Sequence, residues 1–145
     1  MKKAIFLLAL LGLTILSCKK MNSSNSSGSF DGNWRMISVK DNTSGLITTK
    51  PASIQGDVDI TFSPQSSSGG VIFGNTPTNE IGQSAYSIDA NGSITIPALY
   101  LTSKVMETPW GKEFVDNIIN SRQYSLVSSN LIIKTSTKTL TFQKR

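Results

Sequence analysis

Short segments in which apolar and polar residues alternate recur along this chain, and turn residues separate them. The strictest example is residues 57–62, in which three apolar side chains alternate with two aspartates and a threonine. Because successive side chains of a strand point to opposite faces, this alternation predicts a half-buried β-strand. The Asn91-Gly92 pair is a strong signal for a hairpin between two such segments.

The other segments of this kind lie between clusters of Gly, Pro, Asn, Asp and Ser, which predict turns. The predicted strands cover residues 32–40, 57–62, 71–73, 84–88, 93–96, 123–127, 131–134 and 139–143, and residues 46–49 could add a short strand that Pro51 ends. About eight short strands joined in sequence predict a mainly β fold, an antiparallel meander. Closing the meander into a barrel would remove exposed sheet edges, so we expect a barrel.

One segment follows a different period. Trp110, Phe114 and Ile118 are four residues apart, a spacing that places them on one face of an α-helix. Thr108 followed by Pro109 is a typical N-cap and first helical position. The chain is therefore expected to contain one amphipathic helix, over about residues 109–121, which covers an opening or a face of the barrel.

The first 17 residues have the features of a secretory signal peptide. A basic start is followed by an apolar run over residues 4–16. This run is shorter than the roughly 20 apolar residues that a membrane-spanning helix needs, and its length is typical of a signal peptide. It ends at Ile15-Leu16-Ser17-Cys18, which resembles a bacterial lipobox. We predict a lipoprotein signal peptide over residues 1–17 and lipid attachment at Cys18.

Residues 18–29 are predicted to be a flexible lipidated tether, because this Ser- and Asn-rich stretch has almost nothing to bury. The expected partner of the tether is the membrane, since two or more acyl chains give stable anchoring. Lys19-Lys20 stands where an acidic export signal would lie, which favours an outer-membrane lipoprotein that faces the periplasm. Residues 30–145 then form the folded domain.

The composition excludes several kinds of chemistry. The chain has no histidine and a single cysteine, which lipidation would use. Thiol nucleophiles, histidine bases, Ser-His-Asp triads and the usual zinc sites are therefore excluded. The basic residues are scattered and form no patch of the kind that binds nucleic acid. We expect no enzyme activity, no cofactor, no metal and no nucleic-acid partner.

Several residues allow two interpretations. Trp34 could line a ligand cavity, but a tryptophan here is expected to plug the closed end of a barrel. The apolar helix face that contains Phe114 could dock a partner, but its spacing is more typical of a core.

Acidic and nucleophilic residues also allow two interpretations. Asp57 and Asp59, with Asp31 or Asp41, could bind calcium, but we expect a solvated pair. Ser103-Lys104 could form a serine–lysine dyad, but neighbours on a strand point to opposite faces.

The order of short motifs in the chain resembles the META domain (HslJ-like) family. The matching stretches are Gly32–Met36, Ile60–Phe62, Asn79 with Gly82 and Tyr86, Thr102 with Met106, and the hairpin over 131–142. The resemblance implies a calycin-like barrel without a defined enzymatic activity, in exported proteins with stress-associated roles. The Gly-x-Trp motif is also similar to that of lipocalin-like lipoproteins of Bacteroidota.

The chain departs from the META pattern at its cysteines. Thr78 stands where the family has one cysteine, and Glu107 or Thr108 stands where it has a second. The resemblance implies that these two positions pair, so we expect packing alone to hold this barrel together.

Three functions remain open at this level. The first is a non-enzymatic outer-membrane lipoprotein that acts in envelope maintenance, stress tolerance or contact with an envelope protein. The second is a lipocalin-like binder of a small apolar ligand. The third is a periplasmic inhibitor of a hydrolase, which would use an exposed loop such as residues 65–70 or 74–79.

Overall fold

The computed structural model describes residues 30–103 and 105–145 of the chain. The predicted signal peptide, the lipid attachment at Cys18, the tether and Lys104 lie outside the described residues. The elements are β1 (Gly32–Asp41), β2 (Ile47–Thr49), β3 (Asp59–Ser66), β4 (Gly69–Asn75), β5 (Glu80–Ile88), β6 (Ile94–Thr95), α1 (Pro109–Ile118), β7 (Gln123–Val127), β8 (Asn130–Lys134) and β9 (Lys138–Lys144).

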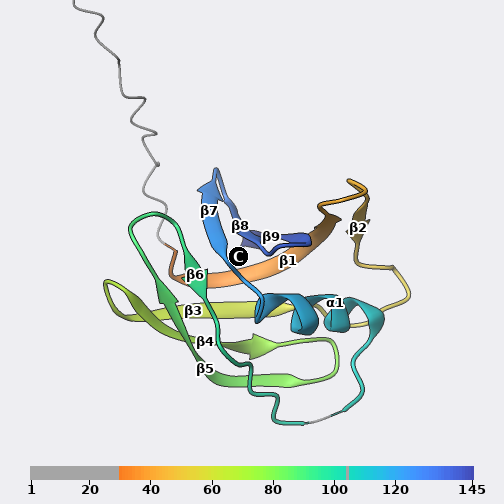
Figure 1. Ribbon diagram of the computed structural model, residues 1–145. Helices are drawn as coiled ribbons and strands as arrows, with labels where there is room; N and C mark the ends of the chain where they lie inside the picture. Colours follow the sequence, from red (N-terminus) through yellow and green to blue (C-terminus); the bar gives the residue numbers. More distant parts are fainter. Residues whose placement is uncertain (1–29, 104) are drawn as a thin grey trace, which may run out of the picture.

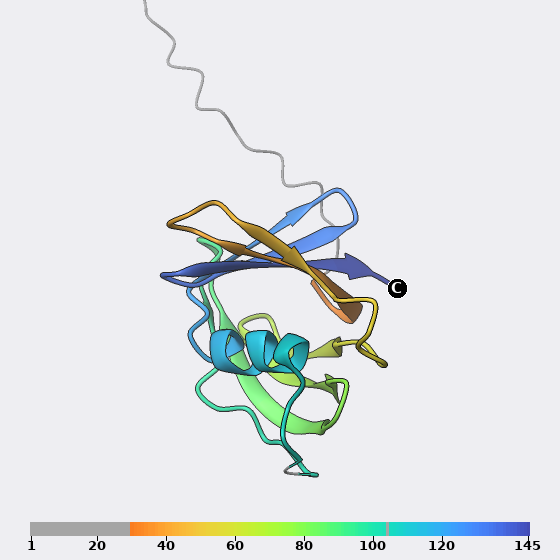
Figure 2. The same ribbon diagram turned by 90° about the vertical axis from the view of Figure 1, so that its right-hand side faces the viewer.

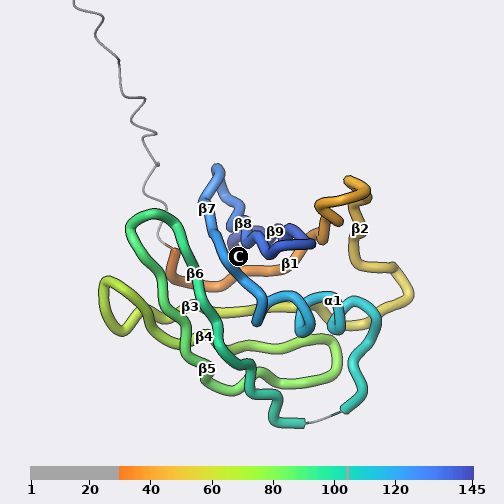
Figure 3. Tube along the Cα trace, in the orientation of Figure 1, coloured from red at the N-terminus to blue at the C-terminus, as the bar shows by residue number. Residues whose placement is uncertain are grey.

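Eight of these strands form an antiparallel meander that curls into a nearly closed barrel, as the alternation predicts (Figures 1 and 3). Their order in the sheet is β6-β5-β4-β3-β1-β9-β8-β7, so β1 and β9, the first and last strands of the described residues, are neighbours. One edge of β1 pairs with β9, while its other edge pairs first with β3 and then with β2.

The barrel closes at a narrow seam between β6 and β7. An isolated bridge joins the two sides there. The Ile94 amide donates to the carbonyl of Arg122 at 3.1 Å, and the Tyr124 amide donates to the carbonyl of Gly92 at 2.8 Å. Because β6 has only two residues, this contact is much shorter than the ladders elsewhere in the sheet.

The helix α1 covers one opening of the barrel, as Figure 2 shows from that end. The Thr108 hydroxyl accepts a hydrogen bond from the Gly111 amide at 3.1 Å and caps the helix. Trp110, Phe114 and Ile118 are buried, which confirms the core interpretation of this face. The helix ends at Ile118, before the predicted position 121, because the chain turns there into the segment that leads to β7.

The barrel interior is filled by side chains that the alternating pattern points inward. Trp34 is 2% exposed, and its indole N–H donates to the carbonyl of Phe30 at 3.0 Å. Trp34 therefore packs in the core. The buried apolar residues are Trp34, Met36, Val39, Val58, Ile60, Phe62, Ile72, Ile81, Tyr86, Ile94, Ile96, Trp110, Phe114, Ile118, Leu131, Ile133, Leu140 and Phe142.

Phe30 packs into the end of the barrel at which the described chain begins. Its ring centroid lies 4.4 Å from that of Phe62, 4.7 Å from that of Tyr124 and 5.6 Å from that of Tyr86. Burial in this cluster raises the pKa of the Tyr86 hydroxyl. The helix and Phe30 thus fill opposite ends of the same core.

Candidate functional site

A polar cluster joins the loop between β4 and β5 to the segment that precedes α1. Asn79 is 3% exposed, and its side chain forms hydrogen bonds with both main-chain groups of Val105. Its amide nitrogen donates to the Val105 carbonyl at 2.7 Å, and its amide oxygen accepts from the Val105 N–H at 2.8 Å. This pairing fixes the position of one residue of an otherwise irregular segment.

Glu107 lies next to this clamp, and its half-buried carboxylate accepts three side-chain hydrogen bonds. The donors are the hydroxyl of Thr76 at 2.7 Å, the hydroxyl of Thr78 at 2.8 Å and the amide of Asn79 at 2.6 Å. In residues 30–103 and 105–145, Glu107 forms no ion pair. Neutral donors therefore satisfy the charge of Glu107.

The three donors are themselves held in place by a tight turn. The Thr76 amide donates to the Asn79 carbonyl at 2.8 Å, and the Asn79 amide donates to the Thr76 hydroxyl at 2.9 Å. The Thr76 hydroxyl thus bonds to a backbone N–H of its own turn, and such side-chain hydrogen bonds stabilise turns. The turn between β4 and β5 is thus a fixed base for Glu107.

A second contact holds the start of the same segment against β5. The Gly82 amide donates to the carbonyl of Tyr100 at 2.8 Å, and the Thr102 amide donates to the carbonyl of Glu80 at 3.0 Å. We call residues 100–103 and 105–107 the contact loop. It is fastened to the barrel near both of its ends.

Three apolar side chains of the contact loop are exposed, beside the polar Thr102 and Ser103. Met106 is 90% exposed, Tyr100 62% and Val105 55%. Isolated apolar side chains on a surface need no explanation. Here three of them lie on one loop that hydrogen bonds fasten to the barrel.

The sequence alone did not identify this site, although the META resemblance pointed at two of its positions. The hydroxyl of Thr78 donates to the carboxylate of Glu107 at 2.8 Å, at the positions where the family has cysteines. The two positions are therefore neighbours in the structure. Hydrogen bonds join them, in addition to the packing of the core.

The two aspartates of the alternating strand face outward, as predicted, and bind cations of the protein itself. Arg35 lies 2.8 Å from Asp59 and 2.9 Å from Asp57. Lys50 lies 2.8 Å from Asp57, and Arg145 lies 2.9 Å from Asp59. The hydrogen bond from Lys50 is the main cause that lowers the pKa of Asp57. These ion pairs occupy the carboxylates that a calcium ion would need.

The remaining candidates do not assemble into a site. Hydrogen bonds from the amide and hydroxyl of Ser44, with Lys138, lower the pKa of Asp41 to about 2. Asp41 thus stabilises the turn after β1. No group of three or more His, Cys, Asp or Glu side chains that could hold a metal lies within the described residues. The proposed dyad of Ser103 with Lys104 includes a residue outside them.

The loops suggested for a hydrolase inhibitor are less free than expected. Residues 65–70 belong mostly to β3 and β4, which pair as far as Ser66 and Gly69. Residues 76–79 form the turn that holds Glu107. The contact loop is an irregular segment with exposed side chains. The sequence offered one signal for it, because Val105 and Met106 are apolar residues that precede the helix N-cap and belong to no predicted strand.

Comparison with known proteins shows the fold and no family. No family model matches the chain, and no curated protein matches its sequence. The chain is similar to a crystal structure, at 1.00 Å resolution, of a DUF4847 family protein from Bacteroides vulgatus ATCC 8482. The TM-score is 0.56, the identity 16%, and the match covers 79% of this chain and 93% of that one.

Two further observations concern the chain as a whole. Across the part of the chain that the structure describes, no helix is both long and apolar enough to cross a bilayer. The similarity at 16% identity is a similarity of fold, so the chain has a DUF4847-like β-barrel.

Proposed function

We propose that the chain is a lipoprotein of the bacterial outer membrane, anchored through Cys18, with a non-enzymatic, META-like barrel that faces the periplasm. It acts by contact with another envelope protein, in envelope maintenance or stress tolerance. The observation that carries the proposal is the exposure of Met106, at 90%, on a loop that the Asn79 and Glu107 hydrogen bonds hold in place.

The physical support is preorganisation. A loop that is already fixed loses little conformational entropy when a partner binds, so more of the contact energy appears as affinity. Methionine suits such a surface, because its flexible and polarisable side chain adapts to the partner. Tyr100 adds an aromatic ring, a side chain that is enriched at protein interfaces.

The two alternatives differ in what the structure offers them. A binder of a small apolar ligand needs free interior space, whereas the core here is filled with side chains. A hydrolase inhibitor needs a fixed and exposed loop, and the contact loop meets that requirement. The inhibitor is therefore the second candidate, and its partner would be a hydrolase of the envelope.

Photo-crosslinking in living cells tests the contact. A photoreactive phenylalanine analogue at position 106 is expected to form one adduct whose protein mass spectrometry identifies, and Met106→Asp is expected to abolish copurification of that protein. Val127, which is exposed on β7 at 51%, provides the matched control position. Equal adducts at both positions, or none at position 106, would contradict the proposal. A hydrolase in the adduct would favour the inhibitor.

Fractionation tests the anchor separately. The Cys18→Ser variant is expected to leave the membrane fraction and to lose the label from a fatty acid precursor, because the thiol is the proposed attachment point. The wild-type chain is the control. A variant that stays in the membrane fraction with its label would show that the anchor lies elsewhere.

A further inference from the structure

A break in the ladder between β4 and β5 creates a second distinct surface, on the outside of the barrel. The pairing passes from Ile72 opposite Ser84 to Gly74 opposite Ile81. One residue of β4, Phe73, therefore faces two residues of β5. Such a bulge bends the strand and redirects its side chains, and bulges are enriched next to functional sites.

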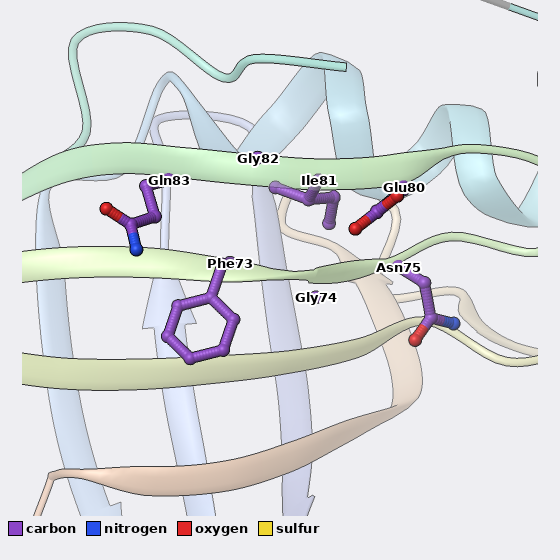
Figure 4. Close-up of a pocket in the computed structure, with 7 residues that line it drawn as sticks. All are labelled: Phe73, Gly74, Asn75, Glu80, Ile81, Gly82 and Gln83. Carbon is purple, nitrogen blue, oxygen red and sulfur yellow. The ribbon is translucent and has the colours of Figure 1, made fainter. Parts of the chain in front are cut away.

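The bulge lies within a shallow groove of about 560 Å³. This volume is within the range of roughly 300–1,000 Å³ that is typical of small-molecule sites. Figure 4 shows the half-buried Phe73 ring almost face-on, lying along the sheet with the Gln83 amide beside it. The residues that line the groove are Phe73, Gly74, Asn75, Glu80, Ile81, Gly82 and Gln83.

The polar side chains of the groove differ from those on the neighbouring strands of the same outer face. On β1 and β3, Thr61 donates to Asn33 at 2.7 Å, and Arg35 binds Asp59 at 2.8 Å. These groups satisfy one another.

The polar side chains of the groove do not satisfy one another in this way. Within the described residues, the side chains of Glu80 and Gln83 have no hydrogen bond or ion pair, although both are exposed beside Phe73. Asn75 uses its amide nitrogen on the carbonyl of Asp57 at 3.1 Å. Its amide oxygen has no donor within the described part of the chain. The groove therefore offers several hydrogen-bonding groups next to an aromatic face.

The backbone of the groove excludes one class of ligand. At this level β4 is paired with β3 on one side and with β5 on the other. The outer edge of β5 takes the backbone of Tyr100 and Thr102. A peptide cannot add as a strand where both edges are used, because strand addition needs free N–H and C=O groups. A ligand must therefore bind by lying on the face.

The charge of the groove excludes another class. Among the described residues, its lining has one carboxylate, Glu80, and no lysine or arginine, so this lining does not attract phosphorylated or sulfated ligands. What remains is an uncharged molecule with one apolar face and several hydroxyl groups. The geometry points to a binding site for a neutral saccharide, whose ring lies on Phe73 and whose hydroxyls bind Gln83, Glu80 and the free oxygen of Asn75.

Saturation-transfer NMR tests the site on the full-length protein in a detergent without a sugar head group. The probes are cellotetraose, maltotetraose and tetra-N-acetylchitotetraose, each at about 10 mM, because a shallow groove is expected to bind at a Kd of about 1 mM. The expected result is transfer to the C–H protons of one sugar face for at least one probe. Absence of transfer to all three probes would overturn the assignment.

Matched variants identify the groove as the origin of the signal. Phe73→Ala is expected to weaken binding about fivefold to tenfold, the effect of losing one aromatic contact. Gln83→Ala, at an exposed position that the fold does not require, is expected to weaken it by a smaller factor. Val71→Ala, on the same outer face of β4, is the control and leaves binding unchanged. Binding that neither Phe73→Ala nor Gln83→Ala reduces would place the sugar elsewhere and overturn the proposal.

Discussion

Asn79 connects two distant parts of the chain with one side chain. It binds both main-chain groups of Val105 and also donates to Glu107. The Asn79 side chain is buried, whereas Val105 is largely exposed and Glu107 is half-buried. Asn79 therefore fixes the contact loop from the core side, together with Leu101, which packs against the core.

The Asn79→Ala variant should lower the free energy of unfolding by about 1–3 kcal/mol, because it removes the hydrogen bonds of a buried side chain to Val105 and Glu107. Urea denaturation, followed by tryptophan fluorescence, measures the change. Asn91→Ala, in the exposed turn between β5 and β6, is the matched control and is expected to change stability by less than about 0.5 kcal/mol. Equal losses in the two variants would show that the clamp does not stabilise the fold.

Asp41 gives the fold a dependence on acid. Its pKa is about 2 in the folded protein, below the ordinary value of 3.8, because Ser44 and Lys138 bind its ionised form. A group with a lowered folded pKa contributes stability above its unfolded pKa and loses it as the pH falls. Between about pH 4 and about pH 2, wild-type stability should therefore fall more steeply than that of Asp41→Asn. Urea midpoints across this range measure both slopes, and equal slopes would refute this role.

At the scale of residues, the pattern predicts the core better than the site. The buried side chains follow from alternation and helical spacing, which depend only on neighbours in the sequence. The Glu107 cluster depends on residues that lie 28 to 31 positions away. No local pattern encodes such a contact. Thr78, with Glu107 or Thr108, stands at the two cysteine positions of the META family, and this resemblance did not predict hydrogen bonds between them.

At the scale of elements, α1 depends on its surroundings. It has 10 residues, and an isolated helix of this length is marginal in water. The Thr108 cap and the buried face supply what the helix lacks. Glu107 lies directly before this cap, so the polar cluster also sets where the helix begins.

This proximity predicts an unusual effect of a glycine replacement. Gly111→Ala would normally stabilise a helix by about 1 kcal/mol. Here a Cβ would overlap the Glu107 carboxylate, which its three donors hold in place. We therefore expect Gly111→Ala to destabilise the protein, as measured by thermal unfolding. In a Glu107→Ala background the same replacement should recover its usual stabilising effect, and a cycle without coupling would contradict this account.

The lengths of β3 and β4 were predicted less well than their existence. The predicted strands over residues 57–62 and 71–73 left a loop that contains Pro64 between them, yet β3 continues to Ser66 and pairs with Gly69. A proline is compatible with a strand at a bulge, and the register shifts between Pro64 and Ser66. The partner strand supplies Gly70, where a Cβ would meet the backbone of Ser63 and Pro64. Pairing in three dimensions thus outweighs the local turn signal.

At the scale of the whole molecule, the barrel and its strand order follow from the sequence, because short turns force consecutive strands to pair. The split pairing of β1 and the path of residues 100–102 along β5 do not. In both cases part of a strand edge is left unpaired by the neighbouring strand. A nearby segment then pairs with that part: β2 pairs with β1, and residues 100–102 pair with β5.

The seam between β6 and β7 should be the first part of the barrel to open. Few main-chain hydrogen bonds cross it, whereas β1 and β9 pair along most of their lengths. Hydrogen exchange measured by mass spectrometry should show faster exchange in peptides over residues 92–96 and 122–126 than in peptides over 36–40 and 138–142, by about tenfold or more. Uniform exchange would indicate that the barrel opens only as a unit.

Because β1 and β9 are neighbours in the sheet, the sheet can be completed only after β9 has been synthesised. A ribosome or a secretion channel delivers β1 before β9, so β1 must wait for a partner that follows the other strands of the described sheet. Contacts between such distant segments form slowly, because the intervening chain has to be closed into a loop. The sheet is therefore incomplete until β9, Lys138–Lys144, is released. The export proposed above would gain from that delay.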